Sequence, residues 1–227
     1  MSAARRIAAL ACAALALAGC RGEPQPAASP PAPPAAAPAW EGTIVALGDS
    51  LTAGYGLAES EAWPALLERR LAAEGRRWRV VNAGISGETS SGALARVDWV
   101  LRQLKPDVVI LETGANDGMR GIELGLVRGN VLAAVRRLQG GGATVVLAGM
   151  QMLRNLGGGY TAEFAAIYPQ VSRETGAILV PFFLEGVAAV PSLNLPDGIH
   201  PNAAGQRRIV ETVHPHVLRA LAERRGR

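Results

Sequence analysis

The amino-acid sequence predicts an α/β fold in three layers, with a central five-stranded parallel sheet covered by helices on both faces. Five short apolar runs alternate along the chain with longer segments in which apolar side chains recur at helical spacing. Such runs are typical of strands buried on both faces. Because helices of ordinary length separate them, consecutive strands are expected to run parallel.

The first strand is predicted at residues 43–47, an apolar run closed by Gly48. A helix is expected from about Ala62, with Ser60 as its candidate N-cap and Pro64 in its first turn. Large apolar side chains lie along one side of this helix: Trp63, Leu66, Leu67 and Leu71.

The rest of the body continues the alternation of strands and helices. In order we expect a strand at 79–82, a helix at 93–104, a strand at 107–111, a helix at 126–138, a strand at 143–147, a helix at 161–175 and a strand at 177–180. A last helix begins near Pro201, and Pro215 is expected to kink or split it.

Residues 1–19 have the pattern of a secretory leader. Two arginines precede an apolar run, residues 7–19, that is too short to span a bilayer as a helix. The run ends in Leu-Ala-Gly before Cys20, which resembles the lipobox of bacterial lipoproteins. This resemblance implies lipidation of Cys20 and anchoring in the cell envelope, facing the periplasm, and Arg21 favours the outer membrane. The alternative is an ordinary secretory peptide and a secreted or periplasmic protein.

Residues 20–39 are predicted to tether the leader to one folded domain, residues 40–227. Thirteen of the fifteen residues from Pro24 to Pro38 are proline or alanine, a composition that buries no core and is extended.

Charge and cysteine content exclude several classes of protein. The net charge is +4 at pH 7, and the leader alone contributes two of these charges through Arg5 and Arg6, so no nucleic-acid-binding surface is expected. Both cysteines, Cys12 and Cys20, lie within the first twenty residues. The body is therefore expected to contain neither a disulfide nor a cysteine-ligated metal.

Four polar clusters lie where the predicted sheet would place a functional site. Residues 48–51 (Gly-Asp-Ser-Leu), 82–87 and 114–117 follow strands, and residues 197–202 (Asp-Gly-Ile-His-Pro-Asn) precede the last helix. Open parallel sheets bind ligands at the carboxyl ends of their strands. Each cluster alone is typical of a turn or a helix cap. Together they supply a hydroxyl, an imidazole, a carboxylate and amide donors, the groups that nucleophilic catalysis needs.

In order and spacing over residues 43–222, these blocks resemble the SGNH hydrolase superfamily of GDSL esterases and lipases, whose fold is flavodoxin-like. Four segments resemble more closely the bacterial thioesterase I/lysophospholipase/arylesterase branch: residues 62–67, 82–89, 117–121 and 167–169.

The resemblance implies that Ser50 is the nucleophile, His200 the base and Asp197 the acid that orients it. The Ser50 N–H, the Gly84 N–H and the Asn116 side chain would form the oxyanion hole. No cofactor is implied. An imidazole takes and returns a proton near neutrality, and a carboxylate three residues away is close enough to fix its tautomer.

Other polar residues near these clusters are expected to have structural roles. Asp49 and Asp117 would hold local turns rather than a metal ion, because no histidine or carboxylate cluster has ligand spacing. His214 and His216 are expected at the surface.

The predicted function is that of a serine esterase acting through an acyl-Ser50 intermediate on aryl esters, lysophospholipids or acyl thioesters. The segment from Ala148 to Tyr160, with Met150, Met152, Leu153 and Leu156, forms either an apolar wall for an acyl chain or a packed loop without substrate contact. Two alternatives remain open: an O-acyltransferase or acetylesterase acting on glycans, and a surface lipoprotein with an idle triad.

Overall fold

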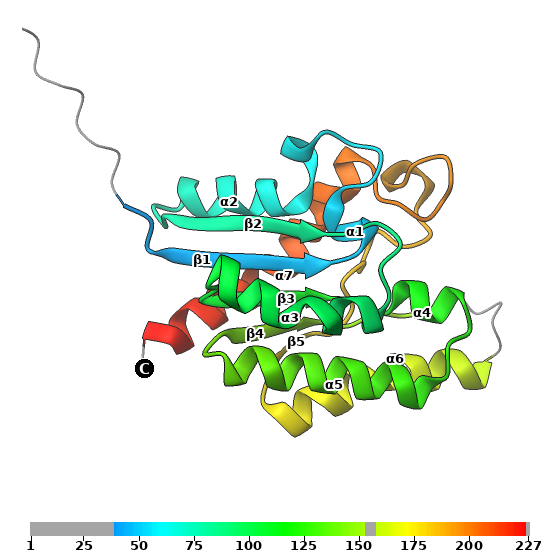
Figure 1. Ribbon diagram of the computed structural model, residues 1–227. Helices are drawn as coiled ribbons and strands as arrows, with labels where there is room; N and C mark the ends of the chain where they lie inside the picture. Colours follow the sequence, from blue (N-terminus) through cyan, green and yellow to red (C-terminus); the bar gives the residue numbers. More distant parts are fainter. Residues whose placement is uncertain (1–38, 153–157, 226–227) are drawn as a thin grey trace, which may run out of the picture. The chain divides into compact units, whose positions relative to one another are not determined.

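A computed structural model of the protein describes residues 39–152 and 158–225. Its centre is a five-stranded sheet in the order β2-β1-β3-β4-β5, in which every neighbouring pair is parallel (Figure 1). The strands are β1 (Gly42–Gly48), β2 (Trp78–Gly84), β3 (Val108–Glu112), β4 (Thr144–Ala148) and β5 (Ile178–Val180). The predicted five-stranded parallel sheet is confirmed. The leader, Cys20 and the Pro/Ala segment lie outside the described residues.

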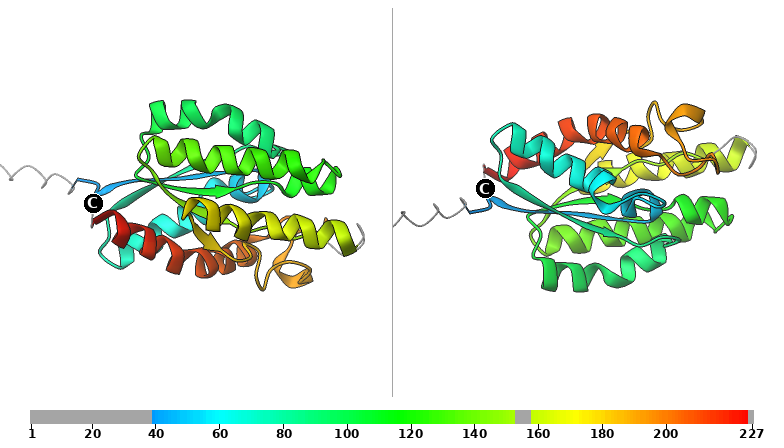
Figure 2. Two further views of the ribbon diagram at one scale, coloured as in Figure 1. Left: turned by 90° about the horizontal axis from the view of Figure 1, so that it is seen from below. Right: turned by 90° about the horizontal axis from the view of Figure 1, so that it is seen from above.

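Helices cover both faces of this sheet, as the sequence predicts. In Figure 2, α3 (Ser90–Leu104) and α5 (Leu124–Gly140) lie on one face, and α2 (Trp63–Ala73) and α7 (Ala203–Arg225) lie on the other. Helix α6 (Gly158–Thr175) packs along α5. No helix of the described residues is long and apolar enough to cross a membrane.

The hydrophobic core lies between the sheet and these two helix layers. Every residue of β3 and of β4 is buried, and β1 is buried from Ile44 onward. The helices add side chains that are entirely inaccessible to solvent: Leu67 and Leu71 from α2, Val97 from α3, Val131 and Val135 from α5, and Val213 and Val217 from α7. Burial of each such side chain stabilises the fold by about 1.5–3 kcal/mol.

The predicted cap at Ser60 is wrong, and of the two outcomes predicted at Pro215 the split of the helix is wrong. Ser60 does not cap α2 but lies in a short 3-10 helix, Glu59–Glu61, and the cap residue Ala62 offers no side-chain acceptor. The Trp63 N–H instead donates to Gln206 of α7 at 2.8 Å, so a distant side chain stabilises the start of the helix. Pro215 does not split α7, which is continuous from Ala203 to Arg225. The fully buried Val213 and Val217 anchor the helix on either side of Pro215.

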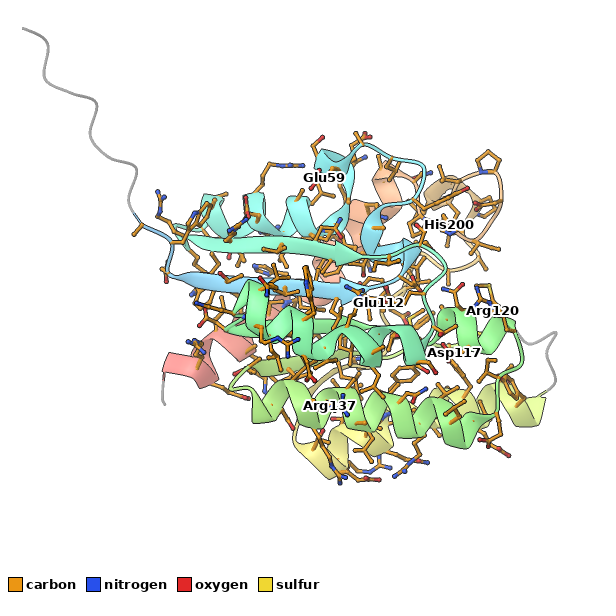
Figure 3. All side chains as sticks on the ribbon, in the orientation of Figure 1. Glu59, Glu112, Asp117, Arg120, Arg137 and His200 are labelled. Carbon is orange, nitrogen blue, oxygen red and sulfur yellow. The ribbon has the colours of Figure 1, made fainter. Side chains whose placement is uncertain are left out.

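Two very short helices follow the carboxyl ends of the central strands. Helix α1 (Ser50–Ala53) comes directly after β1, and α4 (Ala115–Met119) comes after β3. Figure 3 places the labelled residues Asp117, Arg120 and His200 at this end of the sheet. The polar clusters that were predicted to form the site therefore meet at the carboxyl ends of the strands.

Candidate active site

Ser50 is the first residue of α1, immediately beyond the end of β1. Asp49 caps this helix, since its carboxylate accepts a hydrogen bond from the Leu51 N–H at 2.9 Å. The Ser50 N–H donates no hydrogen bond to any residue in the described ranges. The turn thus holds the Ser50 hydroxyl and a free backbone N–H together at the strand exit.

His200 bridges Ser50 and Asp197. Its Nε2 lies 3.0 Å from Ser50 Oγ, and its Nδ1 lies 2.8 Å from Asp197 Oδ2. With the proton on Nδ1, the imidazole donates to the carboxylate and accepts from the hydroxyl, the arrangement a general base requires. The three residues that the sequence singles out, separated by as many as 150 positions, are brought within hydrogen-bond distance.

The Asp197 carboxylate is held ionised by its own loop. Its Oδ1 accepts hydrogen bonds from the N–H groups of His200 at 3.0 Å and Ile199 at 2.9 Å. These two bonds, and then the imidazole of His200, lower the pKa of Asp197 from 3.8 to about 2. Asp197 therefore remains a hydrogen-bond acceptor for His200 at any pH at which the imidazole acts as a base.

Two asparagines fold the loop that presents His200. The Asn194 amide donates to the carbonyls of Val187 and Val190 at 2.7 and 2.8 Å. Asn202 caps the start of α7, because its Oδ1 accepts from the N–H groups of Ala204 and Gly205. Asn194 and Pro201 also form an antiparallel bridge. The bridge closes the loop so that Asp197 and His200 lie on the same turn.

The three predicted oxyanion donors are in different states. Asn116 lines the cavity beside Ser50, but its amide already donates to Asp49 Oδ2 and to the Glu88 carbonyl, both at 3.0 Å. The Gly84 N–H donates to Asn82 Oδ1 at 3.0 Å. Of the three donors, the Ser50 N–H alone has no acceptor among the described residues.

Gly84 lies against the backbone of α1. A Cβ added at Gly84 would lie 2.2 Å from the Ala53 nitrogen, closer than any side chain can approach. The absence of a side chain therefore lets the end of β2 pack directly on the helix that carries Ser50.

A buried carboxyl pair lies behind the nucleophile. Glu112, at the end of β3, accepts from the Asp49 N–H at 3.1 Å and from the Thr52 hydroxyl at 2.8 Å, and it is inaccessible to solvent. Burial, and then the charge of Asp49, raise the pKa of Glu112 well above its usual range. Burial also raises the pKa of Asp49, against hydrogen bonds from Leu51 and Asn116 that lower it. The fully buried Glu112 is thus the carboxyl group of the pair whose ionisation is most strongly disfavoured.

The role predicted for Asp49 is right in part, and that for Asp117 is wrong. Asp49 does hold its own turn, but it also orients Asn116. Asp117 makes no local turn: its carboxylate accepts from the N–H and the hydroxyl of Ser90, at 2.7 and 2.6 Å, and so ties α4 to the start of α3. A carboxylate at a helix start is favourable because the first N–H groups have no partner within the helix.

His214 is not the surface residue that the sequence predicts. Its side chain is only 12% exposed, and Nε2 lies 3.0 Å from Glu74 Oε2, which joins α7 to the end of α2. His216 is partly buried in α7. No group of three or more histidine, cysteine or acidic side chains in residues 39–152 and 158–225 could hold a metal ion.

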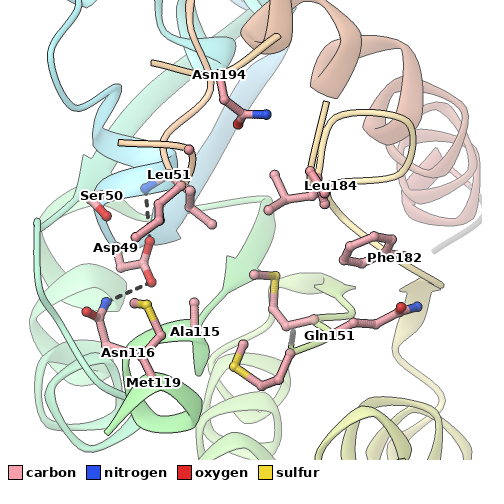
Figure 4. A pocket seen from close by; sticks show the side chains of 16 residues that line it. Asp49, Ser50, Leu51, Ala115, Asn116, Met119, Gln151, Phe182, Leu184 and Asn194 are labelled. Carbon is pink, nitrogen blue, oxygen red and sulfur yellow. Dashed lines mark hydrogen bonds between the residues drawn. The ribbon is translucent and has the colours of Figure 1, made fainter. Parts of the chain in front are cut away.

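An apolar cavity of about 300 Å³ opens beside Ser50 (Figure 4). Asp49, Ser50 and Asn116 form its polar side. Most of the remaining wall is apolar and comes from four segments: Met119, Met150, Met152, Phe182, Leu184 and Ile199. Met150 and Met152 therefore line the cavity, whereas Leu153 and Leu156 lie outside the described residues.

Two residues that touch the site are absent from the sequence prediction. Glu112 ends the apolar run Val-Val-Ile-Leu-Glu, and a charged residue closing a buried strand beside the Gly-Ala-Asn-Asp block is a signal that could have identified it. Tyr55 stacks on His200, with ring centroids 4.4 Å apart. No sequence pattern indicates this contact, because it depends on a loop from the other end of the chain.

Comparison of the chain with known families, relatives and solved structures gives matches that agree with one another. The model of the GDSL-like lipase/acylhydrolase family matches residues 46–208. Esterase TesA of Pseudomonas aeruginosa is 44% identical, with 76% of this chain and 86% of the relative covered. Thioesterase 1/protease 1/lysophospholipase L1 of Escherichia coli is 38% identical, with coverage of 74% and 80%. The crystal structure of the psychrotrophic esterase EstA from Pseudoalteromonas, inhibited by monoethylphosphonate, superposes with a TM-score of 0.76 at 37% identity, covering 80% of this chain and all of that one.

Proposed function

The chain belongs to the GDSL-like lipase/acylhydrolase family and is a serine esterase, and we propose that Ser50, His200 and Asp197 carry out its reaction through an acyl-serine intermediate. The observation that carries this proposal is the continuous chain of contacts from Ser50 Oγ through the imidazole to the Asp197 carboxylate. An apolar cavity beside Ser50 offers the space for an acyl group.

In the acylation step, His200 Nε2 takes the hydroxyl proton as Ser50 Oγ attacks the ester carbonyl carbon. The carbonyl oxygen becomes an oxyanion. The imidazolium then gives its proton to the leaving alcohol as the bond between carbon and leaving oxygen breaks. In the second half a water molecule gives a proton to His200, attacks the acyl carbon and releases the acid. Ser50 regains its proton from the imidazolium.

The Ser50 N–H is the donor ready to receive the oxyanion, because it has no competing acceptor among the described residues. Asn116 contributes when the substrate oxygen replaces the Glu88 carbonyl on its amide, while the bond to Asp49 keeps the amide oriented. Catalytic hydrogen bonds commonly form or tighten only when substrate is bound.

The substrate class follows from the cavity and from the relatives. The thioether and aromatic side chains that line the cavity favour an aliphatic acyl chain, and methionine adapts to acyl chains of different shape. The relatives are named as an esterase and as a thioesterase and lysophospholipase. We propose that the chain hydrolyses aryl esters and lysophospholipids, and thioesters where it meets them.

The proposed location is the cell envelope. The leader pattern and the residues before Cys20 support lipidation of Cys20, with the domain facing the periplasm and the outer membrane favoured over the inner one. In that compartment a lysophospholipid is a more available substrate than an acyl thioester.

Replacing Ser50 by alanine tests the proposed chemistry. Ser50→Ala should lower the hydrolysis of p-nitrophenyl esters by several orders of magnitude, because the nucleophile is removed while the cavity remains. A phosphonate ester should label the unmodified protein at Ser50 and leave the variant unlabelled, as read by mass spectrometry. Full activity in a folded Ser50→Ala variant would refute the proposal.

A further inference from the structure

Tyr55 is a large aromatic residue that is 52% exposed yet held in a defined place. Its backbone N–H donates to the Ser50 carbonyl at 3.1 Å, which ties it to the helix that carries the nucleophile. Its ring lies over the imidazole of His200, with centroids 4.4 Å apart and planes inclined by 33°. The Tyr55 hydroxyl has no hydrogen-bond partner in residues 39–152 and 158–225.

Neither core packing nor a hydrogen bond of its hydroxyl accounts for this position. Tyr55 has about half of its surface in contact with solvent, so it adds little to the hydrophobic core. What the ring does contact is an imidazole whose two nitrogens are already engaged, one by Ser50 and the other by Asp197. The face of the imidazole remains open to a third group, and Tyr55 occupies it.

An aromatic face distinguishes the two charge states of that imidazole. The face of a phenol ring is electron-rich and attracts a cation within about 6 Å of its centroid. His200 becomes a cation each time it takes the Ser50 proton, at the moment when charge develops on the reacting oxygen. A contact that is stronger with the imidazolium than with the neutral ring lowers the barrier without tightening substrate binding.

We propose that Tyr55 is a positioning residue whose ring face stabilises the imidazolium of His200 during acylation and deacylation. This inference rests on the proposed function, since it requires His200 to carry the proton. The carboxylates of Asp197 and Asp49 are the charged groups near the imidazole, and Tyr55 acts with them as an uncharged third partner.

Two substitutions of Tyr55 separate the ring face from the hydroxyl. Tyr55→Leu should lower kcat for p-nitrophenyl esters by about 2- to 30-fold and leave KM within about twofold. Tyr55→Phe keeps the face and should retain kcat within about twofold. Trp99→Leu is the matched control, because Trp99 is 51% exposed on α3 and has no role in the proposed site. A drop in Tyr55→Phe equal to that in Tyr55→Leu, or a change confined to KM, would overturn the proposal.

A fluorinated series distinguishes electrostatics from shape. Relative to phenylalanine at position 55, its mono-, di- and trifluoro analogues should lower kcat stepwise, because fluorine withdraws electron density from the ring face at nearly constant size. A flat series would show that the ring acts by packing alone and would overturn the inference. Ser50→Ala separates this failure from failure of the proposed function: an inactive Ser50→Ala with a flat series rejects only the role of Tyr55.

Discussion

Two buried residues, Asn116 and Glu112, set the geometry around Ser50 through their hydrogen bonds with Asp49. Asn116 is 8% exposed, and its side-chain amide donates hydrogen bonds to the Asp49 carboxylate and to the Glu88 carbonyl. The Asp49 N–H in turn donates to Glu112, which is inaccessible to solvent and whose pKa burial raises well above its usual range. A hydrogen-bonded path therefore leads from the core to the oxyanion donor.

Asn116→Ala should lower kcat by about 10²–10³, the usual cost of losing one oxyanion donor, with a small change in KM. The reason is that the amide contributes mainly when charge develops on the substrate oxygen. Steady-state kinetics on p-nitrophenyl esters measure the effect, and circular dichroism checks the fold. A loss seen only in KM would assign Asn116 to substrate binding instead.

Glu112→Gln should make stability less dependent on pH. Because the folded-state pKa of Glu112 is raised, the folded chain binds a proton that the unfolded chain releases above about pH 4.5. The free energy of unfolding contributed by this group therefore falls as pH rises, by up to about 1.4 kcal/mol per pH unit for one proton. Glutamine keeps a neutral group that can still accept from Asp49 and Thr52.

Thermal unfolding followed from pH 5 to 8 measures this difference. The Tm of Glu112→Gln relative to the unmodified chain should rise steadily across the range. Glu163→Gln on the exposed side of α6 is the control and should show no such trend. A constant difference in Tm would mean that Glu112 is ionised in the folded protein.

At the scale of elements, the close contact between the end of β2 and α1 sets where Ser50 lies. Gly84→Ala would place a methyl group 2.2 Å from the Ala53 nitrogen, so the helix must move. We expect a loss of about 1–3 kcal/mol in stability and a loss of kcat of at least tenfold, since a small displacement of the nucleophile is costly.

Gly129→Ala provides the matched control for that substitution. Gly129 lies within α5 with nothing within 4 Å of an added Cβ, and alanine favours a helix by up to about 1 kcal/mol. Gly129→Ala should keep full activity and unfold at the same or a higher temperature. Equal effects of the two variants would show that contact with α1 is not the reason for glycine at position 84.

At the scale of the whole molecule, the candidate active site lies at the carboxyl ends of the strands, and the first and last elements of the folded domain begin and end at the opposite side, at the amino ends of the strands. In Figure 1 all strands point toward the same end of the sheet, the end at which Figure 3 labels His200, whereas β1 begins and α7 ends at the opposite end. The described side chains of the hydrophobic core all come from the segment that begins with β1 and ends with α7.

A chain that lacks residues 1–39 should fold and keep full esterase activity. The full chain expressed in a Gram-negative host should fractionate with membranes, and Cys20→Ala should release active protein into the soluble envelope fraction. Activity assays on separated fractions, with mass spectrometry of the N-terminus, measure the outcome. Membrane association unchanged in Cys20→Ala would reject lipidation at this residue.

The sequence alone determined the alternation of strands and helices, the parallel sheet and the edge at which the polar clusters meet. The apolar runs and helical repeats carry this information locally, because burial of one face dictates the spacing of apolar residues. Ser50, Asp197, His200 and Asn116 lie in the short polar blocks at these strand ends, and the resemblance of the four blocks to the SGNH hydrolases is what singled them out.

The partners of these residues depend on how the elements pack in three dimensions. Three contacts join segments that are far apart in sequence. They are the ring contact between Tyr55 and His200, the hydrogen bond from the start of α2 to Gln206, and the hydrogen bonds between Ser90 and Asp117. The raised pKa of Glu112 likewise depends on what surrounds it in space. Hydrogen bonds and desolvation act over a few ångströms, so they are set by how the elements pack and leave no periodic trace in the chain.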